Sequence, residues 1–94
     1  LHARLDVASK ADSDTLEVGV NYFADLSSDA TVTLPASPSN GDVVIVKAAG
    51  LSSATIIINR AGSQEIDGET SVTIESPYGA VTMVYVANND WRLV

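Results

Sequence analysis

At 94 residues the chain is long enough for one small domain, and because it has no cysteine, neither disulfides nor thiolate metal sites can stabilise it. Twelve acidic residues against five basic ones give a formal net charge of −7, and the basic residues are scattered singly along the chain. This charge disfavours binding to nucleic acid and to anionic membranes, and no apolar run approaches the length of a membrane span.

Residues 1–15 predict an N-terminal arm or a first edge strand, because apolar and polar side chains alternate at residues 3–7 before a polar stretch begins. The histidine of the chain, His2, lies in this segment without a neighbouring partner to orient it, so we expect no general base there. Asp12 and Asp14 have the spacing of two calcium ligands, but the glycine and the bidentate glutamate of a calcium loop do not follow them. Turn formation is therefore the simpler interpretation of this pair.

Residues 16–94 predict a single β-sandwich domain that begins with a strand at residues 16–23. In this stretch, LEVGVNYF, the apolar residues occupy every second position, which predicts that they share one face: Leu16, Val18, Val20 and Tyr22. The same alternation groups Val32 with Leu34, and Val72 with Ile74. Strands of this kind have one face in the core and the other in water.

Two runs are apolar on both faces, DVVIVKAA at residues 42–49 and ATIIINR at residues 54–60. We expect them at the centre of their sheets, where both sides are covered. The final ribbon, GAVTMVYVANNDWRLV, has a similar pattern, with Val81, Met83 and Tyr85 on one face and Val84, Val86, Leu93 and Val94 on the other. So short a chain can cover only some of these faces itself, so we expect a neighbouring subunit to cover the rest.

Glycine, proline or asparagine separates these runs at regular intervals, as in SNGD at residues 39–42, IDGET at residues 66–70 and ANND at residues 87–90. About eight short strands at this spacing predict an all-β fold. The expected architecture is a small β-sandwich of antiparallel strands in a jelly-roll-like or Greek-key order.

Acidic and aromatic side chains are the remaining candidates for a functional site. The acidic residues cluster around the IDGET turn: Glu65, Asp67, Glu69 and Glu75. Because carboxylates are rarely buried unpaired, this cluster predicts a solvated face that keeps exposed strand edges from pairing. Tyr85 and Trp91 flank the final tip and predict a packed cross-strand pair. Tyr78 lies in a Pro-Tyr-Gly turn, where an exposed ring is a candidate ligand contact.

Three segments in this order, TVTLPASPSNGDVVIV, ATIIINRAGSQEIDG and YGAVTMVYVANNDWRLV, resemble small β-modules in structural proteins of tailed bacteriophages. Such modules occur in tail fibres, head fibres and capsid decoration proteins. The matching features are the Leu-Pro-x-x-Pro reversal at residues 34–38, the turn at residues 66–68 and the Tyr-Gly lead into the strand at residue 80. The resemblance covers residues 20–94 and implies a virion-surface role with trimeric assembly.

The resemblance implies a non-enzymatic protein of the capsid or tail surface, a capsid decoration (cement) or fibre module that forms a homotrimer. Its expected partners are further copies of itself and other virion proteins, such as the major capsid or tail protein. We expect no cofactor, no metal and no catalytic residue. The expected oligomer interface consists of Val84, Val86, Trp91, Leu93 and Val94. The alternative function is a carbohydrate-binding receptor-recognition module of a tail fibre, which would bind a host surface glycan through Tyr78.

Overall fold

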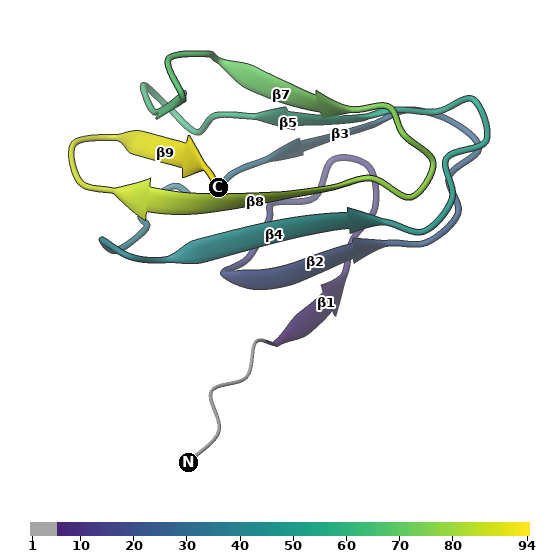
Figure 1. Ribbon diagram of the computed structural model, residues 1–94, viewed down its shortest axis with the longest axis horizontal. Helices are drawn as coiled ribbons and strands as arrows, with labels where there is room; N and C mark the ends of the chain where they lie inside the picture. The colour runs from purple at the N-terminus through teal and green to yellow at the C-terminus, as the bar shows by residue number, and fades with distance from the viewer. Residues whose placement is uncertain (1–5) are drawn as a thin grey trace.

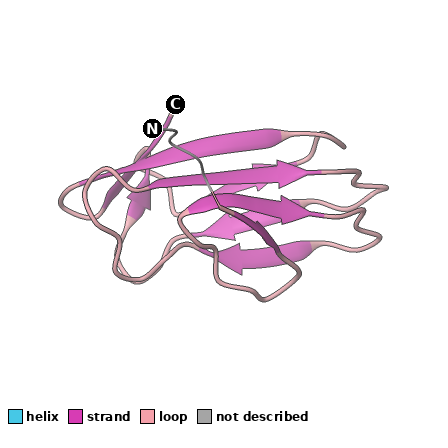
Figure 2. Ribbon diagram, turned by 90° about the horizontal axis from the view of Figure 1, so that it is seen from below, coloured by secondary structure: helices cyan, strands magenta, loops and turns pink. Residues whose placement is uncertain are grey.

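The computed structural model describes residues 6–94, which form nine strands in two facing sheets and no helix (Figures 1 and 2). Sheet A has six strands in the order β1 (Val7–Ser9), β2 (Gly19–Phe23), β4 (Val43–Ala48), β8 (Ala80–Val86), β9 (Asp90–Leu93) and β6 (Glu65–Ile66). Sheet B has three strands in the order β3 (Ala30–Thr33), β5 (Ile56–Asn59) and β7 (Ser71–Ile74). The predicted all-β sandwich is confirmed.

The hydrophobic core lies between the two sheets. The predicted inward residues of sheet B are buried, with Val32 and Leu34 at 0 % exposure and Ile74 at 4 %. The two runs that are apolar on both faces are β4 and β5, and each has a strand on either side in its sheet, so their predicted central position is confirmed. Residues 7–9 form an edge strand beside β2, whereas His2 lies outside the described residues.

The antiparallel arrangement expected from the sequence is wrong for most of the sandwich. Of the seven strand pairings in residues 6–94, four are parallel: β1–β2, β2–β4, β3–β5 and β6–β9. From β2 to β8 the chain alternates between the two sheets, and β4 and β5 return to their own sheets parallel to β2 and β3. A parallel neighbour needs a crossover connection. Here a strand of the opposite sheet supplies it, which a jelly-roll or Greek-key order does not describe.

The N-terminal two thirds of the described chain therefore winds as stacked coils. In sheet A, Val7 pairs with Val20, which pairs with Ile45. Between the sheets, Leu26 forms a parallel bridge with Leu51, so the Leu-Ser-Ser segment at residues 26–28 lies beside the identical segment at residues 51–53. The recurrence of Leu-Ser-Ser 25 residues later is visible in the sequence and is the signal that could have predicted the parallel pairing.

The β8–β9 ribbon is the one place in residues 6–94 where consecutive strands pair directly as a hairpin. Its tip turns through Asn88 (φ 69°) and Asn89 (φ 64°), both in the left-handed region. Asparagine tolerates that conformation, and two such residues form the turn that matches strand twist. The predicted polar tip is confirmed.

The inward face of β2 is the reverse of what alternation of its apolar residues predicts. Gly19, Asn21 and Phe23 point into the sandwich, and Val20 and Tyr22 point out. Gly19 has φ of +109°, and a Cβ there would lie 2.8 Å from the Asp6 carbonyl oxygen. Only glycine can therefore occupy this position without moving the backbone.

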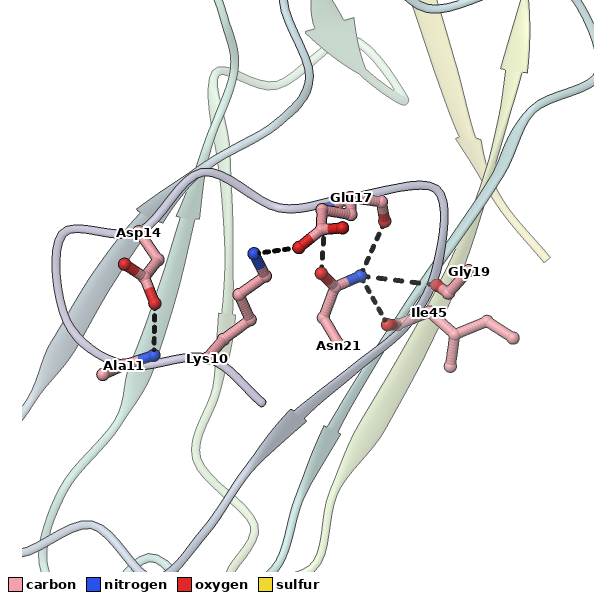
Figure 3. Close-up of polar contacts among 7 residues, drawn as sticks. All are labelled: Lys10, Ala11, Asp14, Glu17, Gly19, Asn21 and Ile45. Carbon is pink, nitrogen blue, oxygen red and sulfur yellow. Dashed lines mark hydrogen bonds and ion pairs between the residues drawn. The ribbon is translucent and has the colours of Figure 1, made fainter. Parts of the chain in front are cut away.

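The buried Asn21 amide satisfies the backbone where the chain enters β2 (Figure 3). Its Oδ1 accepts from the Glu17 N–H at 2.8 Å, and its Nδ2 donates to the Glu17 carbonyl oxygen at 2.8 Å and to the Ile45 carbonyl oxygen at 3.2 Å. A buried amide is tolerated only when its hydrogen bonds are made. This network fixes Asn21 inside, and period-two alternation then forces Val20 and Tyr22 outward.

Candidate functional site

Three of the five residues expected at the oligomer interface, Val84, Val86 and Val94, point away from the core on sheet A. Val86 is 46 % exposed and Val84 is half-buried, while the alternate residue Met83 is fully buried. The predicted division of β8 into two faces is therefore confirmed. Val94 continues the pairing beyond β9, where its N–H donates to the Thr82 carbonyl oxygen at 3.0 Å, and it is 79 % exposed.

Trp91 is not available to another subunit, which corrects its place in the expected interface. Its side chain is 0 % exposed, and its Nε1–H donates to Gln64 Oε1 at 3.0 Å within the core. It pairs across β8–β9 with Tyr85, and the rings meet edge to face with centroids 5.2 Å apart, as predicted for this aromatic pair. The indole ring packs in the core because the side chain of Trp91 points from β9 toward sheet B.

Leu93 also lies on a different face from the one expected. It pairs directly with Met83, and directly opposite residues of an antiparallel pair project to the same side of the sheet. Leu93 is therefore on the inner side of β9, at the border of the core, with 40 % exposure. It does not share a face with Val84, whose partner on β9 is Arg92.

A larger apolar surface emerges on the outside of sheet A. Register aligns Val7, Val20 and Ile45 in one row and Val43 with Val84 in the next. Together with Tyr22, Thr82 and Val86, these residues form what we call the outer face of sheet A. Val7 is 69 % exposed and Tyr22 is 38 % exposed, and the central members are half-buried by their neighbours.

Charge is nearly absent from this surface over four strands. On β1, β2, β4 and β8, the one charged side chain that alternation places outward is Lys47. Charged residues return only at the other end of the sheet, on β9 and β6, where Arg92 lies 3.6 Å from both Asp90 and Asp67. In a chain of net charge −7, no acidic side chain points outward from these four strands, and Asp90, opposite Val86 on β9, borders them.

The outside of sheet B is a useful internal comparison. Register places Thr31, Ile57 and Thr73 in one row and Thr33, Asn59 and Ser71 in the next. Hydroxyl and amide groups suit a sheet face that remains in water, and Ile57 is isolated among them. The two outer faces of this sandwich are thus chemically different, and the apolar one belongs to sheet A.

Tyr78 lies at the rim of an open hollow of about 280 Å³ at one end of the sandwich. Three connections form it: β2–β3, β4–β5 and β7–β8, which all turn at the right-hand end of Figure 1. Besides Tyr78, which is 71 % exposed, the lining includes Asp25 and Ser52. The sequence singled out Tyr78 but not Asp25 or Ser52, because their proximity depends on the stacked coils.

The other acidic candidates have structural roles. Asp12 Oδ1 accepts from the Thr31 N–H at 2.8 Å, and Asp14 Oδ2 accepts from the Ala11 N–H at 2.8 Å, so both fix the turn that precedes sheet B. The cluster of Glu65, Asp67, Glu69 and Glu75 is exposed, which confirms the predicted solvated face. Across residues 6–94, no three His, Cys, Asp or Glu side chains are grouped closely enough to hold a metal ion.

No model of a known protein family matches the chain, and no curated protein matches it. Within residues 6–94, the structure contains no helix long and apolar enough to cross a membrane. The outer face of sheet A and the hollow beside Tyr78 are therefore the two surfaces from which a function can be inferred.

Proposed function

We propose that the protein is a non-enzymatic structural module that assembles into a homotrimer through the outer face of sheet A. The observation that carries this proposal is the charge-poor, β-branched surface over β1, β2, β4 and β8. Contiguous exposed apolar surface of this kind marks protein–protein contacts. The outer face of sheet B supports the proposal by comparison, because its hydroxyl and amide side chains are typical of a sheet face that remains in water.

A further copy of the chain is the partner that this surface fits best. Sheets pack face to face when β-branched side chains interdigitate, and identical copies supply a matching sheet without any additional protein. Copies of net charge −7 repel one another least where their uncharged strands meet. A small domain without disulfides also gains most from burying such a surface.

The place of assembly that we propose is the surface of a bacteriophage particle, as a capsid decoration (cement) or fibre module. Support comes from the resemblance of residues 20–94 to β-modules of tailed-phage structural proteins. The turn at residues 66–68 that contributes to the resemblance has Asp67 (φ 48°) and Gly68 (φ 85°) in the left-handed region, as its sequence requires. The proposed partners are the major capsid or tail protein.

Replacing Val84 with aspartate should dissociate the trimer. The substitution places a carboxylate inside the proposed interface, beside an Arg92 that already pairs with Asp67 and Asp90, so the added charge weakens association by about 100-fold or more. Sedimentation velocity at micromolar concentration is expected to give a trimer for the wild type and a monomer for Val84→Asp. Circular dichroism of both proteins checks that the fold is retained.

The matched control is Thr73→Asp, which introduces the same charge at an outward strand position of sheet B. It should leave the trimer unchanged. A wild-type protein that sediments as a monomer would overturn the proposed assembly, as would equal behaviour of the two variants.

Antibodies against the chain are expected to label, in electron microscopy, the surface of intact phage particles whose genome encodes it. Labelling confined to the capsid or to the tail would distinguish a decoration protein from a fibre module. Particles that contain the chain by mass spectrometry but bind no antibody would count against a surface position. Absence of the chain from purified particles would overturn the virion role and leave the trimer measurement unaffected.

A further inference from the structure

The backbone that carries Tyr78 is held in place by three neighbouring contacts. The Gly50 N–H donates to the Pro77 carbonyl oxygen at 2.8 Å, and the Ala48 N–H donates to the Gly79 carbonyl oxygen at 2.9 Å. Between them, the Lys47 ammonium donates to the carbonyl oxygen of Tyr78 itself. Three consecutive carbonyl groups are thus bound to β4 and the turn after it.

The side chain of Tyr78 nevertheless remains 71 % exposed. An aromatic ring with only a packing role would be buried against neighbouring side chains. A ring on a flexible loop would lose conformational entropy when it binds a ligand. Here the backbone is already fixed and the aromatic face is open. Such a rigid aromatic side chain provides contact area at low entropic cost.

Asp25 supplies a carboxylate to the same hollow. It lies against Gly50, where a Cβ would be 3.1 Å from Asp25 Oδ1, and Gly50 has φ of +113°. Glycine at this position therefore leaves the space that the carboxylate occupies. Among residues 6–94 no cation forms an ion pair with Asp25, so its oxygens are available to accept hydrogen bonds from a ligand.

We propose that this hollow binds one ring of a neutral saccharide. The open face of Tyr78 would pack against the C–H face of a pyranose, since the negative face of an aromatic ring attracts weakly positive hydrogens. Asp25 would accept hydrogen bonds from ring hydroxyls, and the Ser52 hydroxyl can donate or accept one. This inference goes beyond the structural role and does not depend on it.

The chemistry of the lining favours a polyhydroxyl ligand over other classes. The Asp25 carboxylate and the net charge of −7 repel anions. A purely apolar ligand would leave the carboxylate and the Ser52 hydroxyl without partners. A hollow of about 280 Å³ that is open to solvent suits a single ring, bound weakly at one site with a Kd on the order of 1 mM.

Titration of the isotope-labelled full chain with methyl hexosides, followed by ¹⁵N–¹H NMR, tests the proposal. The panel contains the methyl glycosides of glucose, galactose, mannose and N-acetylglucosamine, together with tetramethylammonium as a cationic probe. At least one sugar should shift the amide signals of residues 49–52. Tyr78→Ala and Asp25→Asn should each weaken that binding by about 10-fold or more.

Asn40→Ala is the control, because Asn40 is exposed in the connection between β3 and β4 and does not line the hollow. It should leave the sugar affinity unchanged. The proposal is overturned if no sugar shifts these signals at concentrations up to about 20 mM, well above the expected Kd. It is equally overturned if the affinity survives Tyr78→Ala, or if tetramethylammonium binds and the sugars do not.

Discussion

Replacing Trp91 with alanine is expected to lower the free energy of unfolding by about 3–5 kcal/mol, a large share of the stability of so small a domain. Trp91 is the largest fully buried side chain among the described residues. Its loss would open a cavity beside Tyr85, because the surrounding strands are held by their ladders and cannot collapse into the space.

The substitution also affects a buried polar network. Gln64 is 3 % exposed; its Oε1 accepts from Trp91 Nε1 at 3.0 Å and from the Ala61 N–H at 3.2 Å, and its Nε2 donates to the Pro35 carbonyl oxygen at 2.9 Å. Trp91→Phe keeps an aromatic ring but removes the indole donor. That variant should cost roughly 1–3 kcal/mol, less than Trp91→Ala, because the phenyl ring fills part of the cavity while Gln64 Oε1 loses the indole donor.

Urea unfolding followed by circular dichroism measures both variants. All samples must be compared at one protein concentration, because the proposed assembly would make apparent stability concentration-dependent. Tyr78→Ala is the control: it removes an aromatic ring that is 71 % exposed and should change stability by no more than about 0.5 kcal/mol. Equal stability of Trp91→Ala and Tyr78→Ala would contradict the buried position of the tryptophan.

Replacing Asn21 with leucine is the second large effect, with an expected loss of about 2–4 kcal/mol. Leucine is similar in size but cannot bond to the N–H and carbonyl groups of Glu17, which the asparagine amide now satisfies at 2.8 Å each. These backbone groups lie at the entry to β2, where the structure has little room to rearrange because Gly19 passes so close to Asp6. The apolar gain of leucine does not offset unsatisfied backbone groups.

The same substitution at Asn40 provides the control for chemical denaturation. Asn40 is exposed, and its Oδ1 accepts one long hydrogen bond, 3.3 Å from the Ala87 N–H. Asn40→Leu should cost less than about 1 kcal/mol. If Asn21→Leu were as stable as the wild type, the amide would not be what holds β2 in its register, and the outward position of Val20 would need another cause.

The proposed assembly and the stability of this domain both depend on that register. With Asn21 inside, the apolar side chains of β2 are available to the outer face of sheet A, where they lie beside Ile45. Strand β2 therefore supplies the buried hydrogen bonds of Asn21 to the core and an apolar surface to the proposed trimer.

The position of most strands was set by local sequence, because period-two alternation and turn residues act over a few neighbours. DVVIVKAA and ATIIINR are central because flanking strands screen part of both of their apolar faces, and ANND turns because asparagine tolerates positive φ. The acidic cluster around residues 65–75 had to be solvated. The pairing of Tyr85 with Trp91 followed from a short hairpin.

Tertiary structure decided which sheet each strand joined and which of its two faces was buried. Alternation defines two faces without ranking them, and in β2 the amide network of Asn21 outweighed the hydrophobicity of Val20 and Tyr22. A turn signal likewise does not tell whether the chain reverses within a sheet or crosses to the other one. Parallel coils, the burial of Trp91 and the meeting of Asp25 with Tyr78 all depend on contacts between distant residues, which local pattern cannot encode.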